Sequence, residues 1–145
     1  MKSHLLQAAR RGNAEAQFNL GMMYENGLDD SRYVIEGDRS EAMRWLLAAA
    51  EQGLPRAQIR LAEIYAGEPE TPGSSVKACQ WYLLAAAHLR GAYLQKAQAA
   101  YERVSISLTP AQNGEVRRFV QDWKPKPPSP MAMPADADVH EAIRA

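Results

Sequence analysis

The segment AMRWLLAAAEQGLPRAQ, from Ala42 to Gln58, decides the fold because parts of it occur again elsewhere in the chain. Its second half resembles AARRGNAEAQ at 8–17, and its first half returns as ACQWYLLAAA at 78–87. Self-similarity at a spacing of a few tens of residues is typical of repeat proteins, in which one unit must stack on a neighbour to bury its apolar face. The sequence therefore predicts a repeat array.

The composition limits the size and class of the protein. The chain has 145 residues, enough for one domain and about three repeat units. It carries 17 basic and 17 acidic side chains, so its formal net charge is zero. Because proteins that bind nucleic acid or anionic membranes usually carry a basic excess, we expect neither partner.

Cysteine content and the N-terminal segment bear on the compartment. Cys79 is the only cysteine, so we expect neither an internal disulfide nor a zinc site built from several cysteines. The segment from Met1 to Gln7 lacks the apolar run of a signal peptide, and nothing later reaches the roughly 18 apolar residues that a membrane span needs. We expect a cytoplasmic protein unless a leader was removed.

Boundary residues define the first helices. Gly12 is placed to end a helix over 4–11, for which Ser3 is a candidate cap, and Asn13 is placed to begin a second helix over 14–26.

The second of these helices carries one stripe, formed by Ala16, Leu20 and Tyr24, with Gly21 beside it. Inside a helix, glycine costs about 1 kcal/mol relative to alanine. Gly21 therefore predicts that a neighbouring backbone comes too close for a side chain.

The next segment, 28–37, is expected to be a polar connector whose short apolar patch, Tyr33 to Ile35, folds back over the core. Asp38 and Glu41 have the spacing of a capping box, which predicts a helix over 39–52 closed by Gly53. The residues expected on its buried face are Ala42, Trp45, Leu46 and Ala49.

The same arrangement returns in a second unit. Pro55 is expected to begin a helix to about Ala66, and Ser74 or Ser75 is expected to cap another to about His88. The residues that match the stripe of the first unit are Ala57, Leu61 and Tyr65, and those expected to be buried in the following helix are Ala78, Trp81, Tyr82 and Ala85.

The third unit is degenerate. The segment 91–104 keeps Ala97 and Tyr101 at the repeat's separation but has lost the Leu-Gly pair. Thr109, followed by a proline and by Gln112, predicts a capping box that opens a last helix. The apolar face of that helix is Val116, Phe119, Val120 and Trp123.

The C-terminal residues differ in composition from the rest. The segment 124–134 has five prolines and is expected to be extended and poorly ordered, whereas 136–144 is expected to form a short marginal helix. We predict a solenoid domain over residues 1–123 and a Pro-rich, mostly disordered tail over residues 124–145.

Two consecutive patterns carry a family resemblance. Ala-Gln-x-x-Leu-Gly-x-x-Tyr-x-x-Gly, at 16–27, and Glu-Ala-x-x-Trp-Leu-x-x-Ala-Ala-x-x-Gly, at 41–53, resemble the Sel-one-like repeat (SLR) family of tetratricopeptide-like α/α solenoids. The resemblance covers roughly residues 6–104. The chain departs from the family in its enlarged connectors, in Ala62 where the first unit has glycine, and in lacking the cysteines of the disulfide-rich secreted relatives.

The resemblance implies an all-α fold, an α/α superhelix with about two clear and one degenerate helix-hairpin repeats and a C-terminal capping helix. By similarity to the family, the first helix of each pair lines the concave surface. The positions left for that surface are Glu15, Phe18, Met22 and Glu25 in the first unit and Arg56, Ile59 and Glu63 in the second. Large apolar groups beside charges suit a peptide or helix partner.

The remaining chemical groups favour structural roles. Trp45 and Trp81 lie among alanines at helical spacing, as expected for core packing rather than a stacking platform. The three histidines are too scattered for a metal site, and Cys79 has no base adjacent in sequence, so we expect an inert, half-buried thiol. We expect no cofactor and no catalytic residues.

These observations favour a non-enzymatic interaction module or adaptor that binds a protein or peptide on its concave face. An alternative is a small cell-wall-related hydrolase or β-lactam-binding protein, because some cysteine-rich members of the family have been linked to those activities. Another alternative is a homo-oligomeric scaffold that assembles through its last helix.

Overall fold

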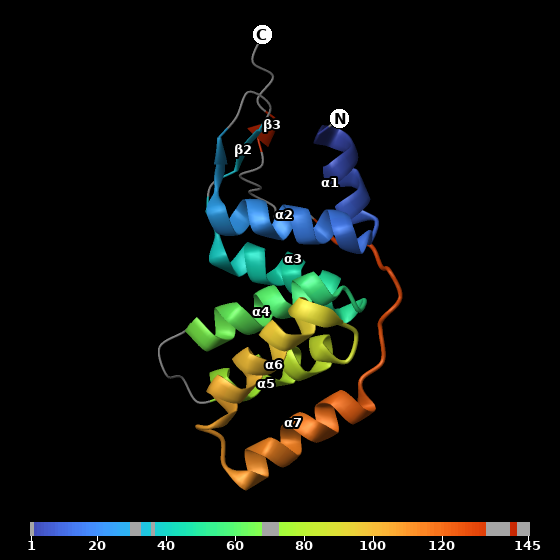
Figure 1. Cartoon of the computed structure of the whole chain (residues 1–145). Helices are drawn as coiled ribbons and strands as arrows, with labels where there is room; N and C mark the ends of the chain where they lie inside the picture. The colour runs from blue at the N-terminus through green and yellow to red at the C-terminus, as the bar shows by residue number, and fades with distance from the viewer. Residues whose placement is uncertain (1, 30–32, 36, 68–72, 133–139, 142–145) are drawn as a thin grey trace. The chain divides into compact units, whose positions relative to one another are not determined.

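The computed structural model describes residues 2–29, 33–35, 37–67, 73–132 and 140–141. The helices are α1 Lys2–Arg10, α2 Ala14–Asn26, α3 Arg39–Glu51, α4 Pro55–Gly67, α5 Ser74–Ala86, α6 Gly91–Ser105 and α7 Pro110–Asp122, and the strands are β1 Leu28–Asp29, β2 Tyr33–Ile35 and β3 His140–Glu141 (Figure 1). The chain divides into two compact units. Unit 1 comprises Met1–Leu54 with Lys126–Ala145, and unit 2 comprises Pro55–Pro125.

Unit 1 is built on the close pairing of α2 with α3, and α1 packs on α2. Its core contains Leu20, Tyr24 and Trp45, each nearly or fully inaccessible to solvent. A Cβ added at Gly21 would lie 2.8 Å from the Leu46 Cγ and 3.2 Å from the Ala42 carbonyl oxygen. The predicted close approach is therefore confirmed, although its nearest atom belongs to a side chain rather than to the backbone.

Side-chain caps begin the two central helices of unit 1. The Asn13 side chain accepts a hydrogen bond from the Ala16 N–H at 2.9 Å, and the Asp38 side chain accepts one from the Glu41 N–H at 3.1 Å. Both predicted caps are confirmed, but the capping box predicted for Asp38 and Glu41 is not complete, because the Asp38 N–H donates to the Tyr24 carbonyl at 2.8 Å. The Glu41 carboxylate lies 3.2 Å from the Arg44 guanidinium, an ion pair on the same helix.

The structure corrects two expectations about the connectors of unit 1. The segment expected to be a polar connector contains β1 and β2, which pair antiparallel with Leu28 opposite Ile35. The helix expected over 136–144 is wrong at His140–Glu141, which form β3 and pair with β2; the rest of that range lies outside the described residues. An isolated helix of nine residues is unstable in water. Pairing with β2, which contains β-branched residues, instead gives the backbone of β3 hydrogen-bond partners.

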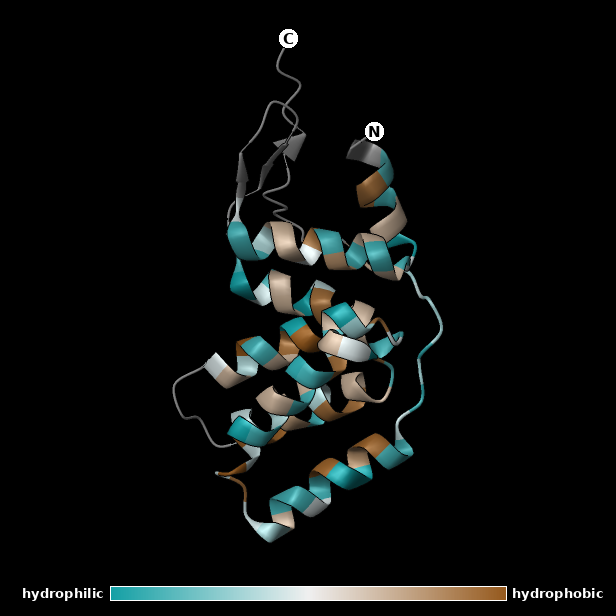
Figure 2. Ribbon diagram, in the orientation of Figure 1, coloured by the Kyte–Doolittle hydropathy of each residue, from teal (hydrophilic) through white to brown (hydrophobic). Residues whose placement is uncertain are grey.

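Unit 2 pairs α4 with α5, and both α6 and α7 pack on α5. The predicted burial of Trp81 and Tyr82 is confirmed. Phe119 of α7 meets the Trp81 ring edge to face, with ring centroids 5.4 Å apart. Figure 2 shows polar and apolar residues alternating along α7, whose apolar residue Val116 is fully buried.

Of the three helix starts predicted in unit 2, two are confirmed and one is wrong. The helix α4 begins at Pro55, as predicted. Thr109 and Gln112 form the predicted capping box. The Gln112 N–H donates to the Thr109 hydroxyl oxygen at 3.1 Å, and the Thr109 N–H donates to the Gln112 side-chain oxygen at 2.9 Å. Ser74 does not cap α5; it is the first helical residue and is buried, while Gly73 precedes it with φ of 93°. In the second repeat, Ile64 is buried and Tyr65 is partly exposed.

The C-terminal segment returns to unit 1. Residues Lys126–Ala132, which we call the strap, have no helix or strand and are hydrogen-bonded to helices of that unit. The boundary proposed from the sequence between a domain over 1–123 and a tail over 124–145 stays a prediction. Within that tail, the strap follows a defined path.

Candidate partner-binding surfaces

The predicted partner positions in unit 1 lie on one face of α2. Because they are three, four and three residues apart, they point to the same side of the helix. Glu15 is exposed, and Phe18, Met22 and Glu25 are partly buried. The other side of α2 is packed into the core by its fully buried leucine and tyrosine. The α2 face thus combines two large apolar side chains with a carboxylate at each end.

The predicted positions in unit 2 lie on one face of α4. Arg56 and Glu63 are exposed, and Ile59 is partly buried. The Glu63 carboxylate lies 3.2 Å from the Arg60 guanidinium. Such an exposed pair on a helix surface contributes little to stability, so the carboxylate is available for exchange with a partner's cation.

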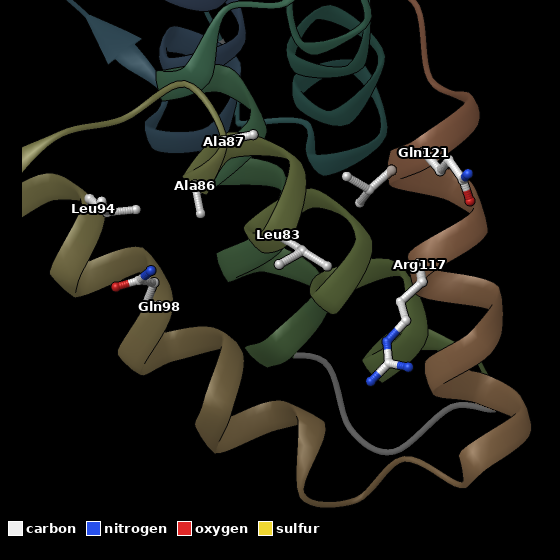
Figure 3. A pocket seen from close by; sticks show the side chains of 8 residues that line it. Leu83, Ala86, Ala87, Leu94, Gln98, Arg117 and Gln121 are labelled. Atoms are coloured by element: carbon white, nitrogen blue, oxygen red, sulfur yellow. The ribbon is translucent and has the colours of Figure 1, made fainter.

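Unit 2 also has a hollow that sequence reasoning missed. It encloses about 430 Å³, and Figure 3 shows side chains of three helices facing it. The lining residues are Leu83 and Ala86 of α5, Ala87 directly after it, Leu94 and Gln98 of α6, and Arg117, Val120 and Gln121 of α7. The hollow lies between α6 and α7, both of which pack on α5. In the sequence, this hollow corresponds to the third unit, which has lost the Leu-Gly pair.

Two buried titratable groups of unit 2, Cys79 and Tyr82, have a raised pKa. Cys79 is fully buried, more so than expected, and this burial raises the pKa of its thiol to about 11. Burial, and next the Glu63 carboxylate, also raises the pKa of the Tyr82 hydroxyl. Both groups therefore stay protonated near neutral pH, and a protonated thiol is a poor nucleophile.

Two further kinds of site concern all of the described residues. Within the described residues, no group of three or more His, Cys, Asp or Glu side chains is placed to hold a metal ion. None of the helices described in 2–132 combines the length and the hydropathy that crossing a bilayer requires.

Comparison with protein families identifies the repeats. The Sel1 repeat model matches residues 14–54 and 55–88, which together make up just over half of the chain. The first match contains α2 and α3, and the second contains α4 and α5. Each match therefore corresponds to one helix pair.

Three curated proteins are similar over part of the chain. The ERAD-associated E3 ubiquitin-protein ligase component HRD3A of Arabidopsis thaliana is 40% identical over 40% of this chain. Chitin synthase regulatory factor 3 of Schizosaccharomyces pombe and chitin synthase regulator SKT5 of Saccharomyces cerevisiae are each 35% identical, over 51% and 55% of it. The chain spans only 8%, 7% and 11% of these relatives.

Two crystal structures share the fold. The protective antigen c5321 of uropathogenic Escherichia coli, which displays an SLR fold, is 28% identical with a TM-score of 0.66, over 82% of this chain and 24% of that protein. A Sel1 repeat protein from Oxalobacter formigenes is 29% identical with a TM-score of 0.53, over 83% and 97% of the respective chains. These likenesses confirm the predicted all-α solenoid fold.

Proposed function

Because the chain belongs to the Sel1 repeat family, we propose that it is a non-enzymatic adaptor that holds a protein or peptide partner on the outward face of α2. The matched relatives support this class of function. One is named as a component of a ubiquitin ligase and two as regulators of chitin synthase, so each is named by its relation to another protein or enzyme.

The observation that carries the proposal is the composition of the α2 face. Phe18 and Met22 remain partly exposed one turn apart, although the core side of the same helix is fully packed. An aromatic ring supplies a large contact area, and methionine adapts its shape to an irregular partner. Since Glu15 and Glu25 lie at the two ends, the partner that fits best has an apolar anchor flanked by Lys or Arg.

A two-site substitution tests the α2 face. We expect the double variant Phe18→Asp, Met22→Asp to lose the partner that co-purifies with the native protein, because two carboxylates replace the apolar contact. The matched control is Leu47→Asp on α3, another exposed apolar residue of unit 1. The helical circular dichroism and melting temperature of all three proteins should agree. Undiminished capture by the double variant would refute this site.

The hydrolase alternative has its own test. Incubation with a chromogenic β-lactam should give no turnover above a buffer blank. The buried, protonated Cys79 thiol supports that expectation. Measurable turnover would overturn the adaptor proposal.

The hollow between α6 and α7 favours self-assembly as a second candidate function. Its lining is mainly apolar, and two large exposed apolar side chains, Tyr93 and Ile106, lie on and directly after α6. A second copy that filled the hollow would remove apolar surface from water. Light scattering over a concentration series should then show a dimer that Val120→Asp abolishes. A monomer at every concentration would exclude this candidate.

A further inference from the structure

The strap is attached to unit 1 by its few backbone donors. Three of the six residues at 126–131 are prolines, so only Lys126, Ser129 and Met131 retain a backbone N–H. The Lys126 N–H donates to the Glu51 carbonyl at 2.8 Å, and the Met131 N–H donates to the Arg10 carbonyl at 2.7 Å.

The two acceptors belong to helix ends. Glu51 is the last residue of α3, and Arg10 is the last residue of α1. The last carbonyls of a helix have no partner within the helix and need one from outside. The N–H groups of Lys126 and Met131 are five residues apart, which corresponds to about 16 Å in an extended segment at 3.1 Å per residue. The strap therefore supplies one donor to the end of α3 and another to the end of α1.

Gly12 leaves room for the middle of the strap. It has φ of 107°, and a Cβ added there would lie 2.7 Å from the Ser129 nitrogen and 3.0 Å from the Pro128 Cβ. Any other residue would be strained by this backbone conformation and would collide with the strap. Gly12 therefore forms a slot for an approaching extended backbone.

The end of the strap is an apolar anchor. Met131 packs against the core cluster that contains Ala9, Ala16 and Leu20. The amide of Gln17 lies with its Nε2 3.5 Å from the Met131 sulfur. This position therefore accepts a long, polarisable side chain.

The floor of the site is fixed by a hydrogen-bonded network. Gln17 Nε2 donates to the Ala9 carbonyl at 3.1 Å, and Gln52 Nε2 donates to the Gln17 Oε1 at 2.9 Å and to the Gly12 carbonyl at 2.6 Å. A hollow of about 500 Å³ beside it is lined by Arg11, Gly12, Asn13, Gln52 and Pro128, among others. The site is thus held in shape by the side chains of Gln17 on α2 and of Gln52, the residue that follows α3.

Charged groups hold both ends of the strap. The Lys126 ammonium lies 2.6 Å from the Glu51 carboxylate, and the Arg44 guanidinium donates to the Ala132 carbonyl. These contacts favour a cation five residues before the methionine and an ordinary peptide carbonyl after it.

We propose that unit 1 carries a binding site for an extended peptide of the form Lys-Pro-Pro-x-Pro-Met, and that the strap occupies it until a partner segment of the same chemistry displaces it. Residues 126–130 are exposed and only Met131 is partly buried, so few contacts must break for exchange. The site does not include the partner positions of the α2 face, and the proposal does not rest on them.

The peptide KPPSPMA-amide, with a fluorophore on its N-terminus in place of an acetyl group, tests the site by fluorescence anisotropy. In the full-length Met131→Asp variant the strap loses its anchor, so the peptide should bind at least 10-fold more tightly than to the native protein. Adding Gly12→Val to this variant fills the slot and should abolish binding. The Phe18→Asp, Met22→Asp variant should bind the peptide as the native protein does, which separates this site from the α2 face.

Several results would overturn the proposal. One is the absence of peptide binding to a Met131→Asp protein that circular dichroism shows to be folded. If the Gly12→Val combination misfolds, a peptide with aspartate in place of methionine serves as the control, and equal binding of both peptides counts against the site. In the native protein, rapid hydrogen exchange of the Lys126 and Met131 amides would contradict the observed attachment. A dimer that Met131→Asp dissolves would show that a second copy, not a partner, fills the site.

Discussion

Replacing Gly21 with alanine tests whether close contact between α2 and α3 governs the packing of unit 1. The added Cβ would lie 2.8 Å from the Leu46 Cγ, a distance at which something must shift, and 3.2 Å from the Ala42 carbonyl oxygen. The second repeat has a fully buried alanine, Ala62, at the corresponding position, with Tyr82 in place of the leucine. The clash should therefore be specific to the first repeat.

The magnitude follows from two opposing effects. Alanine is about 1 kcal/mol better than glycine inside a helix, whereas forcing an extra methyl group into a filled core costs about 1–3 kcal/mol. Gly21→Ala should therefore lower the free energy of unfolding by up to about 2 kcal/mol. In a Leu46→Ala background the shortest contact is gone, so Gly21→Ala should raise the free energy of unfolding by up to about 1 kcal/mol.

The assay is urea unfolding of the four proteins in this double-mutant cycle. The coupling free energy should be about 1–3 kcal/mol. Gly114→Ala on α7 is the matched control, because its Cβ would meet only the Arg118 Nη1 at 3.7 Å, and it should stabilise the protein by about 1 kcal/mol. If Gly21→Ala stabilises the native protein as much as this control does, the reasoning about close packing is refuted.

Three further predictions concern the core, the thiol and a cap. Trp45→Ala should lower the free energy of unfolding in urea by about 3–5 kcal/mol because the ring is fully buried, whereas Tyr93→Ala, at a side chain 74% exposed, should change it by less than about 0.5 kcal/mol. Burial raises the pKa of the Cys79 thiol from 9.0 to about 11, so the unfolded chain loses the thiol proton at a lower pH than the folded protein does. The free energy of unfolding should therefore fall as the pH rises from 9 to 11, and melting curves of the Cys79→Ala variant should lack that part of the decline. Thr109→Ala should cost about 0.5–2 kcal/mol in the same urea assay, and a cost below that of an exposed substitution would contradict the capping role.

Features set by neighbouring residues were predictable from the sequence. Asn13, Asp38 and Thr109 each accept a hydrogen bond from the N–H three residues on, so the cap and its partner lie within one turn. The buried stripes were predictable for the same reason, because side chains three and four residues apart share a helix face. The burial of Trp45 and Trp81 followed directly from that period.

Features set by distant residues were not predictable. The strand β3 depends on its pairing with β2, and the order of the strap depends on the Arg10 and Glu51 carbonyls. Both sets of partners lie far away in the sequence. One feature of the sequence pointed to the buried network around Gln17. The Ala-Gln pair recurs at 57–58, and the second glutamine, Gln58, is also fully buried. The partner positions on α2 stay a proposal, and those on α4 stay a prediction.

The third helix pair links the loss of a motif to a surface. In the first repeat, Gly21 of α2 leaves room for Leu46 and the Ala42 carbonyl of α3, and the Leu-Gly pair to which this glycine belongs is missing from α6. Without it, α6 and α7 each pack on α5 and leave the hollow between them. An apolar hollow open to water lacks the dispersion contacts that a filled groove would have. The degenerate third repeat of unit 2 therefore leaves apolar surface exposed, and this surface is the basis of the self-assembly test with Val120→Asp proposed above.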